Sequence, residues 1–469
     1  MYRIFRHYIP KSLFILGLAE VLILLVSVYL GVTLTLVDGH GASAPVGIEG
    51  GAAVLLLKAL VYTLVMFVVM MAMGLYQRDL RDGPRETLLR LAISFGLGLM
   101  LMAAIYALMP QLFLGRGVFF LALACAFLGI VSCRFLAYQR TDMRLTHNIL
   151  VLGAGEKASQ IQRLRRRTDR LGVNIVGYVD VVGSGPMVLP QDQLLKVSSS
   201  LQQLAEEKQI DEIIVALDDR RKNIPIDEIL ECKLKGIRIL EVSDYLERQL
   251  GKINLDALNP SNVVFSDGFS QAAVRAGSKR LFDILVSSLF LIAASPVMLL
   301  AAFCIWAESG YKGSVIYRQQ RVGMNGRPFD VLKFRSMCEN AEKDGVQWAK
   351  VNDDRVTRIG AFMRKTRIDE LPQLLNVLQG DMSFVGPRPE RPVFVGELEQ
   401  EIPFYGLRHH VKPGITGWAQ ICYPYGSSVN DAREKLQYDL YYMKNYSVFL
   451  DITILLQTAT VILWGKGAR

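Results

Sequence analysis

Cysteine is scarce in the 469-residue sequence, and its positions show no pairing pattern. The six cysteines lie far apart, at positions 125, 133, 232, 304, 338 and 422, and no CxxC motif occurs. Zinc sites and disulfide frameworks need characteristic cysteine spacings, so neither is expected. The N-terminus also lacks a small-residue cleavage site behind a short apolar core, so we expect no removable signal peptide.

Recognisable nucleic-acid-binding motifs are absent as well, although the net charge of +9 favours an anionic partner. We therefore expect membrane lipids or a phosphate-bearing substrate as the partner, and no nucleic acid. Hydrophobic residues make up 51% of the chain and charged residues 21%. This mixture indicates membrane segments attached to soluble domains.

Four apolar stretches occupy most of the first 140 residues, at 12–37, 52–75, 91–109 and 117–136. Each approaches or exceeds the roughly 20 residues that a helix needs to cross about 30 Å of hydrocarbon. Basic residues flank both ends of this region, whereas the loop 38–51 has none and the loop near Pro110 has only Arg116. The positive-inside rule predicts a four-helix transmembrane bundle over 1–145 with both ends in the cytoplasm. A buried soluble core is the alternative interpretation.

Strand and helix patterns alternate from 146 to 250, with strand-like runs at 148–152, 174–179, 210–217 and 236–242. This alternation predicts a Rossmann-like α/β domain with a parallel sheet. After its first strand, Gly153, Gly155 and Ala158 match the GxGxxA pattern of dinucleotide-binding turns. The domain also resembles the cofactor domain of nucleotide-sugar dehydratases, but the Tyr-x-x-x-Lys pair those enzymes need occurs nowhere in the chain. We expect a vestigial or regulatory nucleotide-binding fold, not a second active site.

A further apolar segment, 281–306, follows a less regular stretch and the cations Lys279 and Arg280. It is long enough to span a bilayer. Ser295 and Pro296 near its middle predict a bend, because proline removes a backbone donor and serine can satisfy a freed carbonyl. The residues fit a kinked spanning helix and a re-entrant helix equally well. Lys279, Arg280 and Lys312 could then lie at the anionic cytoplasmic surface.

The densest chemical run is RKTRIDELPQL at 364–374, in which the carboxylates Asp369 and Glu370 follow three cations. One carboxylate could attack phosphorus and the other could hold Mg²⁺, which prefers oxygen ligands. Taken alone, the run fits an ordinary charged helix surface better than an active site. Downstream, GPRP at 386–389 places Arg388 between two prolines, a rigid turn suited to gripping phosphate. The run KPGITGW at 412–418 adds a cation, turn glycines and an aromatic ring.

Together these runs resemble the bacterial sugar transferase family, the monotopic phosphoglycosyl transferases, over about residues 275–469. The resemblance includes the Lys279-Arg280 pair, Ser295-Pro296, KFRSM at 333–337 and the runs around Asp369, Arg388 and Trp418. It implies an α/β phosphoglycosyl transferase domain whose re-entrant membrane helix, about 281–306, breaks at Ser295-Pro296. That topology keeps the catalytic domain on the cytoplasmic face, where nucleotide sugars are found.

The resemblance also implies a mechanism. Asp369 is expected to be the nucleophile, forming a covalent phosphosugar and releasing UMP from a UDP-sugar. Undecaprenyl phosphate then attacks, giving undecaprenyl-diphosphate-sugar. Glu370 is expected to bind the Mg²⁺ cofactor. The residues expected to bind the substrate phosphates are Arg364, Arg388, Lys333 and Arg335.

The whole chain resembles the large, WbaP-like architecture, with a linker at 251–274 before the catalytic domain at 275–469. The sequence CYPYG at 422–426 departs from the Asn-Gly-Arg type of many relatives and resembles a branch associated with exopolysaccharide synthesis. If this stretch contacts the nucleotide or sugar, the donor can differ from that of better-known relatives. The family implies UDP-glucose or UDP-galactose as the donor, with an N-acetylated sugar as the alternative. It also implies a multi-pass protein of the bacterial inner membrane, and the large architecture suggests a homodimer. The competing hypotheses are a membrane-anchored dehydratase or epimerase and a membrane sensor or scaffold without catalysis.

Overall fold

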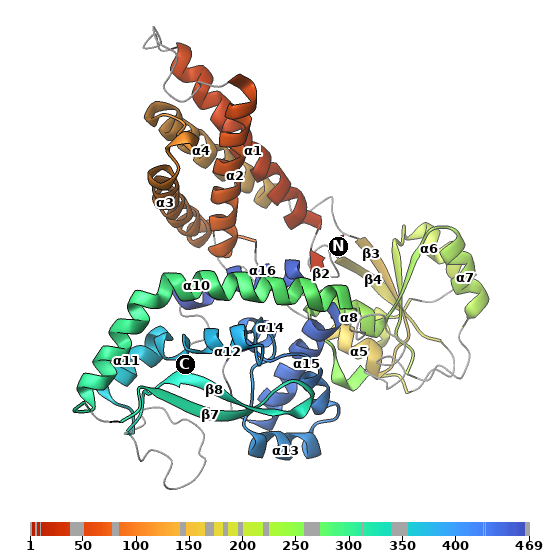
Figure 1. Cartoon of the computed structure of the whole chain (residues 1–469). Helices are drawn as coiled ribbons and strands as arrows, with labels where there is room; N and C mark the ends of the chain where they lie inside the picture. Colours follow the sequence, from red (N-terminus) through yellow and green to blue (C-terminus); the bar gives the residue numbers. More distant parts are fainter. Residues whose placement is uncertain are drawn as a thin grey trace. The chain divides into compact units, whose positions relative to one another are not determined.

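The computed structural model describes residues 2–4, 7–9, 11–37, 51–76, 84–140, 147–164, 173–181, 186–195, 200–218, 225–257, 273–311, 313–338, 355–424, 426 and 428–464. The chain forms two compact units, Met1–Gly251 and Lys252–Arg469. Figure 1 shows the helices and strands of each unit. The first residues of the expected linker, 252–257, belong to the second unit, and 258–272 lie outside the described residues.

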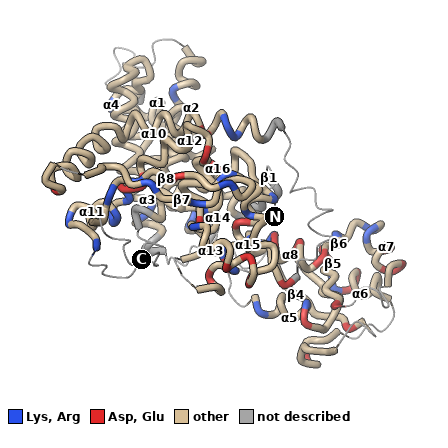
Figure 2. The backbone as a smooth tube through the Cα atoms, turned by 60° about the horizontal axis from the view of Figure 1, so that its bottom comes forward, with Lys and Arg blue, Asp and Glu red and all other residues tan. Residues whose placement is uncertain are grey.

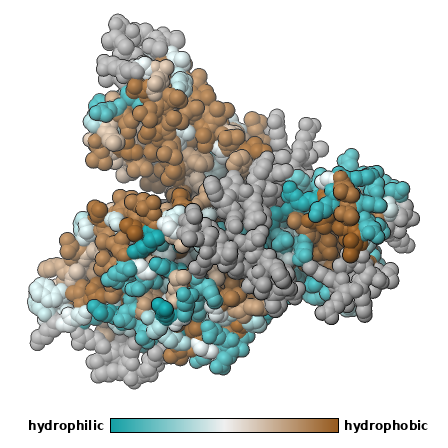
Figure 3. All heavy atoms as spheres, turned by 45° about the vertical axis from the view of Figure 1, so that its right-hand side comes forward, coloured by the Kyte–Doolittle hydropathy of each residue, from teal (hydrophilic) through white to brown (hydrophobic). Residues whose placement is uncertain are grey.

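Four long apolar helices follow a short hairpin of β1 (Tyr2–Ile4) and β2 (His7–Ile9). The helices are α1 (Lys11–Val37), α2 (Gly51–Ala72), α3 (Pro84–Leu108) and α4 (Arg116–Arg140), with the turn η1 (Pro110–Leu112) before α4. They coincide with the four predicted stretches, and each is long and apolar enough to cross a membrane. Side chains such as Leu24, Tyr62 and Met66 pack between them, whereas much of their outer surface is hydrophobic (Figure 3). Apolar side chains on all faces of a helix are typical of membrane spans.

A buried ion pair joins α1 to α4. Arg134 Nε lies 2.7 Å from Glu20 Oε1, and the Tyr76 hydroxyl also donates to Glu20. Charged groups among apolar helices are costly unless they are paired, so this contact fixes how the two helices pack.

The α/β domain is a parallel sheet of β3 (His147–Leu152), β4 (Val173–Val179), β5 (Glu212–Val215) and β6 (Arg238–Glu241), in the order β4-β3-β5-β6. Its helices are α5 (Glu156–Gln162), α6 (Leu201–Glu207), α7 (Ile226–Leu234) and α8 (Val242–Leu250), with the turn η2 (Gln191–Gln193). Alternate residues of β3 enter two separate apolar clusters, one with α5 and α8 and the other with α6 and α7. Both faces are therefore covered, which explains why β3 is a continuous apolar run.

The second unit begins with η3 (Leu255–Ala257) and contains the longest helix, α10 (Ala273–Glu308). A hairpin of β7 (Ile316–Val322) and β8 (Pro328–Phe334), connected by η4 (Met324–Gly326), follows it. Next come α11 (Arg358–Thr366), η5 (Ile368–Glu370), α12 (Gln373–Gln379) and β9 (Ser383–Val385). The last elements are α13 (Pro392–Glu401), η6 (Tyr405–His410), β10 (Gly414–Thr416), α14 (Trp418–Cys422), α15 (Val429–Asn445) and α16 (Val448–Trp464).

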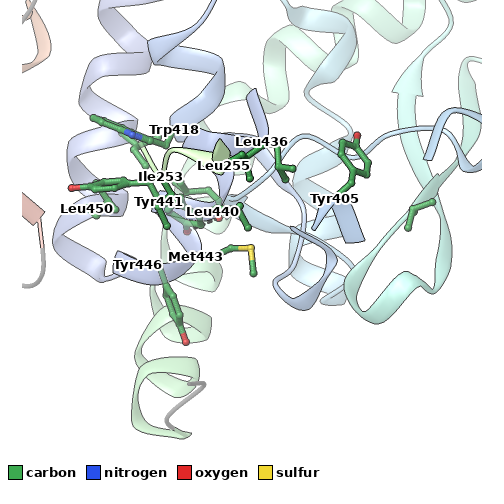
Figure 4. Close-up of a cluster of buried hydrophobic side chains, with 14 of the residues drawn as sticks. Ile253, Leu255, Tyr405, Trp418, Leu436, Leu440, Tyr441, Met443, Tyr446 and Leu450 are labelled. Atoms are coloured by element: carbon green, nitrogen blue, oxygen red, sulfur yellow. Dashed lines mark hydrogen bonds between the residues drawn. The ribbon is translucent and has the colours of Figure 1, made fainter. Parts of the chain in front are cut away.

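The core of this unit is a cluster of aromatic and aliphatic side chains around α14, α15 and α16 (Figure 4). Trp418 stacks on Tyr441, and Leu450 from α16 is fully buried. Ile253 and Leu255 also enter this cluster, and the Ile253 N–H donates to the Gln437 carbonyl over 3.0 Å. The start of the expected linker is thus fixed onto the second unit, and α16 packs on the same core.

The helix α10 is longer than the apolar run that predicted it, because helical structure continues back through the polar residues before Leu281. It bends near its middle (Figure 1), where Pro296 lies inside the helix. The Ser295 hydroxyl donates over 2.8 Å to the carbonyl of Ile292, the acceptor that proline leaves without its usual N–H. The first part of α10 packs on α12, β9 and α16, and the last part on α11. Both ends of this apolar helix therefore contact the rest of the second unit.

Candidate active site

The two central carboxylates lie in a turn between α11 and α12, not on a regular helix surface. Helix α11 ends at Thr366, and Arg367 takes a left-handed conformation with φ of 62°. A single 3-10 turn, η5, then carries Asp369 and Glu370 before α12 begins. The reversal at Arg367 directs both carboxylates inward, so Asp369 is 9% exposed and the Glu370 side chain 14%. The interpretation as a solvated helix face is therefore wrong.

Three cations surround Glu370. Its Oε1 atom lies 3.4 Å from Arg388 Nη2, 3.7 Å from Lys333 Nζ and 3.8 Å from Arg367 Nη1. Burial by itself would raise the pKa of Glu370, but the three cations outweigh it and hold the pKa at about 2. Glu370 is therefore ionised at every physiological pH.

Asp369 has the opposite character. Burial, and next the negative charge of Glu370, raise its pKa to about 6 against the opposing effect of Lys333, Arg367 and Arg364. Its Oδ1 atom is buried and has no hydrogen-bond partner among the described residues. A desolvated carboxylate with a bare oxygen, ionised at neutral pH, is a competent nucleophile.

The structure brings three of the four predicted phosphate-binding residues, Lys333, Arg388 and Arg364, to the carboxylate pair from separate elements. Lys333 comes from β8 and Arg388 from the turn after β9, and both contact Glu370. Burial lowers the pKa of Lys333 to about 8. Arg364, in the last turn of α11, acts on Asp369 through its charge. Arg335 is half-buried just beyond the end of β8, with its N–H bonded to the Val315 carbonyl.

Basic residues gather along α11 and the β7–β8 hairpin, as Figure 2 shows in blue. Arg367 belongs to this group but was not among the residues predicted to bind phosphate. Arg367 stands shortly before the carboxylate pair. From the sequence alone, this position gave no more reason to expect a contact with the carboxylates than the position of Arg364 did. This concentration of positive charge suits a diphosphate substrate.

The resemblance implies Mg²⁺, and the residues present fit such an ion. No group of three or more His, Cys, Asp or Glu that could hold a metal occurs within the described residues. The ionised Glu370 carboxylate is nevertheless a ligand that Mg²⁺ accepts, because this ion often needs only one or two carboxylates and completes its shell with substrate phosphates and water.

The cations at the start of α10 point into the catalytic fold. Lys279 Nζ donates to the Val385 carbonyl over 3.0 Å and pairs with Asp451 over 2.8 Å. Arg280 donates to the carbonyls of Val377 and Leu378 at the end of α12, over 2.6 and 2.7 Å. Both side chains are therefore bonded to protein groups of their own unit, and Lys312 lies outside the described residues.

The glycine-rich turn of the α/β domain binds a carboxylate from its own chain. The Asp218 carboxylate accepts the N–H groups of Glu156 (2.8 Å) and Lys157 (2.9 Å), the amides expected to face a pyrophosphate. A Cβ atom on Gly155 would lie 1.9 Å from Asp218, so glycine is required there, and Gly153 has φ of +125°. Ala158, on α5, is fully buried in the apolar cluster. The sequence analysis did not identify Asp218. The feature that could have indicated it is its position just after β5, the strand beside β3.

A buried carboxylate pair among cations, on a fold bound to a long apolar helix, is an arrangement that suits a membrane transferase acting on phosphorylated substrates. The family described as "Bacterial sugar transferase" matches residues 274–465. The chain is 31% identical over 438 residues to the "UDP-glucose:undecaprenyl-phosphate glucose-1-phosphate transferase" of Xanthomonas campestris pv. campestris, covering 87% of each chain. The protein therefore belongs to the bacterial sugar transferase family.

Two further relatives match shorter stretches. One is the "UDP-N-acetylgalactosamine-undecaprenyl-phosphate N-acetylgalactosaminephosphotransferase" of Aeromonas hydrophila, 43% identical over 241 residues, 51% of this chain and 56% of that relative. The other is the "UDP-glucose:undecaprenyl-phosphate glucose-1-phosphate transferase" of Klebsiella pneumoniae, 47% identical over 182 residues, 38% of this chain and 39% of that relative. The chain thus spans less than two thirds of either, and the sugars in the names of the relatives differ.

Proposed function

We propose that the protein transfers a hexose-1-phosphate from a UDP-sugar to undecaprenyl phosphate, as the first membrane step of exopolysaccharide assembly. An Asp369 oxygen attacks the sugar-bearing phosphorus, the bond to the uridine-bearing phosphate breaks, and UMP leaves. A phosphate oxygen of undecaprenyl phosphate then attacks the same phosphorus and returns Asp369 to its carboxylate form. The observation that carries this proposal is the pair of adjacent carboxylates with opposite pKa shifts and a bare Asp369 oxygen.

The neighbouring side chains support the division of roles. Lys333 and Arg388 already contact Glu370, so a diphosphate bound beside the carboxylate pair would meet these cations. Glu370 and the substrate phosphates would hold Mg²⁺, which would neutralise charge on the diphosphate and the departing UMP. Asp369 needs no base to activate it, because it is mostly ionised at neutral pH.

The donor we propose is UDP-glucose or UDP-galactose. Two of the three relatives named above carry glucose in their names, whereas the Aeromonas protein carries N-acetylgalactosamine. The residues around Cys422 lie next to the β10–α14 segment and depart from the pattern of many relatives, which supports the exopolysaccharide-associated branch.

The topology we propose has α1–α4 crossing the bacterial inner membrane and α10 re-entering it from the cytoplasmic side, where the catalytic unit lies. Because both ends of α10 contact one soluble fold, a spanning path would place parts of that fold on opposite sides of the bilayer. The bend at Pro296 and the basic flanks of α1–α4 support the same arrangement. A homodimer remains part of the proposal, to be tested by cross-linking in membranes.

The test uses membranes that contain the full chain, with UDP-sugars, undecaprenyl phosphate and Mg²⁺, and measures UMP release. Wild type should release UMP, and Asp369→Asn should not. The exposed carboxylate Asp227 on α7 offers a matched control, because Asp227→Asn removes the same group in the other compact unit and should keep full activity.

Mass spectrometry of wild type quenched without acceptor should find the phosphosugar on the peptide that contains Asp369. Undiminished UMP release by Asp369→Asn would overturn the mechanism and favour a sensor or scaffold. A panel of UDP-sugars in the same assay identifies the donor.

A further inference from the structure

The loop that carries Arg388 is held through its carbonyl oxygens. Pro387 and Pro389 flank this arginine and have no N–H to donate. Four consecutive carbonyls, those of residues 387–390, each accept a hydrogen bond from another part of the unit. The donors, in that order, are the Gly414 N–H (2.9 Å), the Arg408 guanidinium (2.9 Å), the Arg321 guanidinium (3.2 Å) and the Val322 N–H (2.9 Å).

Arg408 is the more buried of the two arginine donors, Arg408 and Arg321. It is 6% exposed, and its guanidinium pairs with Asp439 Oδ2 over 2.8 Å and donates to the Tyr405 hydroxyl over 2.6 Å. Asp439, on α15, is 2% exposed. The Nη2 atom that contacts Asp439 also donates to the Arg388 carbonyl, and Nη1 donates to Tyr405, so these partners hold the planar guanidinium in one orientation.

We infer that Arg408, oriented by Asp439, is a positioning residue of the transferase site that fixes Arg388 against Glu370. The inference rests on the proposed function. Arg388 has a long side chain, and its Nη2 atom reaches Glu370 Oε1 at 3.4 Å. Holding the backbone on both sides of its Cα atom limits where this guanidinium can go, and so reduces the conformational freedom lost when a phosphate binds. Arg321 does the same from β7, one carbonyl further along.

A buried ion pair can also serve stability alone, and the chain contains a matched example. In the α/β domain, Arg248 and Glu212 form a two-pronged buried pair at 2.7 and 2.5 Å. Its chemistry and burial resemble those of Arg408 and Asp439, but it belongs to the other compact unit. Arg248→Lys therefore measures what the loss of a buried guanidinium costs in a unit that does not contain the Arg388 loop.

The experiment is a double-mutant cycle on the full chain in membranes, with single-turnover UMP release as the measurement. Arg408→Lys should slow release about tenfold or more, and Arg248→Lys less than about twofold. In an Arg388→Ala background, which removes the guanidinium that Arg408 positions, Arg408→Lys should change the rate less than about twofold. A structural defect would lower the rate by the same factor in both backgrounds.

Equal factors in the two backgrounds, or an equal loss from Arg248→Lys, would overturn the inference. If Arg408→Lys fails to fold, Arg321→Lys takes its place, since this arginine is less buried and should show a several-fold loss with the same dependence on Arg388. Wild type is measured first. Absence of UMP release there would refute the proposed function, whereas active wild type with independent effects of the two arginines would refute only the positioning role.

Discussion

Replacing Asp369 by asparagine should stabilise the catalytic unit at pH 8 while it abolishes activity. The wild-type carboxylate is buried beside the negative charge of Glu370, and both effects favour its protonated form. Asparagine has nearly the same shape and no charge. The variant therefore removes the unfavourable ionisation and keeps the packing of the turn between α11 and α12.

The magnitude follows from the pKa of Asp369, which rises from its ordinary 3.8 to about 6 in the folded protein. A raised pKa means that the folded state binds the proton more tightly, so stability is lost as pH rises from 3.8 through 6. Each pKa unit corresponds to about 1.36 kcal/mol, so ionised Asp369 destabilises the folded state by about 3 kcal/mol at pH 8. At pH 5 the penalty is about half as large, because the folded-state carboxylate is mostly protonated there.

Glu370→Gln provides the matched control with the opposite sign. The neighbouring cations, acting against burial, lower the pKa of Glu370 from 4.5 to about 2. A lowered pKa contributes stability that is present above 4.5 and is lost only as pH falls toward 2. Neutralising Glu370 should therefore cost about 3 kcal/mol, nearly unchanged between pH 5 and pH 8.

The assay is thermal unfolding of wild type and both variants in one detergent at pH 5 and pH 8. About 3 kcal/mol corresponds to a Tm shift of roughly 6–12 °C for a unit of this size. Asp369→Asn should raise Tm at pH 8, and by less at pH 5, whereas Glu370→Gln should lower it at both. An Asp369→Asn variant that is no more stable than wild type at pH 8, or equally shifted at both pH values, would refute the reasoning.

Three further results are expected. Single-turnover UMP release should fall about tenfold between pH 7 and pH 5, because only ionised Asp369 attacks and its pKa is about 6; a flat profile would contradict this. Arg280→Ala should lower the stability of the catalytic unit by about 2 kcal/mol in thermal unfolding, since it removes two charge-assisted bonds to the end of α12; an unchanged Tm would contradict it. Asp218→Ala should destabilise the first unit by about 1 kcal/mol, because two α5 amides lose their acceptor, while UMP release stays within about twofold of wild type; a larger loss of activity would connect this turn to catalysis.

Much of the architecture could be predicted from local pattern. The lengths of the apolar runs predicted α1–α4, and the alternation of strands and helices predicted the parallel sheet. The order β4-β3-β5-β6 could not be predicted, because it depends on long-range pairing that leaves no local signal. The polar start of α10 was missed for a related reason, since its helical structure is supported by contacts of Lys279 and Arg280 with distant segments.

At the candidate site, sequence patterns indicated the residues that lie in dense motifs. They did not indicate residues whose partners are distant in the sequence. Asp369, Glu370 and Arg388 lie in dense runs, whereas Arg408 and Asp439 lie 31 positions apart among ordinary polar residues. The pairing of these last two depends on η6 meeting α15, and their burial shows only in three dimensions. The opposite ionisation of two adjacent carboxylates likewise requires the positions of Lys333 and Arg388, which come from elsewhere in the unit.

The contact of Arg280 with α12 has a consequence for how the bilayer affects this enzyme. The helix α12 is seven residues long, about 10 Å; its far end is held by Arg280 of α10, and its near end follows the turn with Asp369 and Glu370. With α10 embedded as proposed, a change in its depth or tilt would move one end of a short rigid element whose other end follows the proposed nucleophile, Asp369. Hydrophobic mismatch between α10 and the lipid chains would then act on the chemical step itself, so acyl-chain length becomes a determinant of turnover.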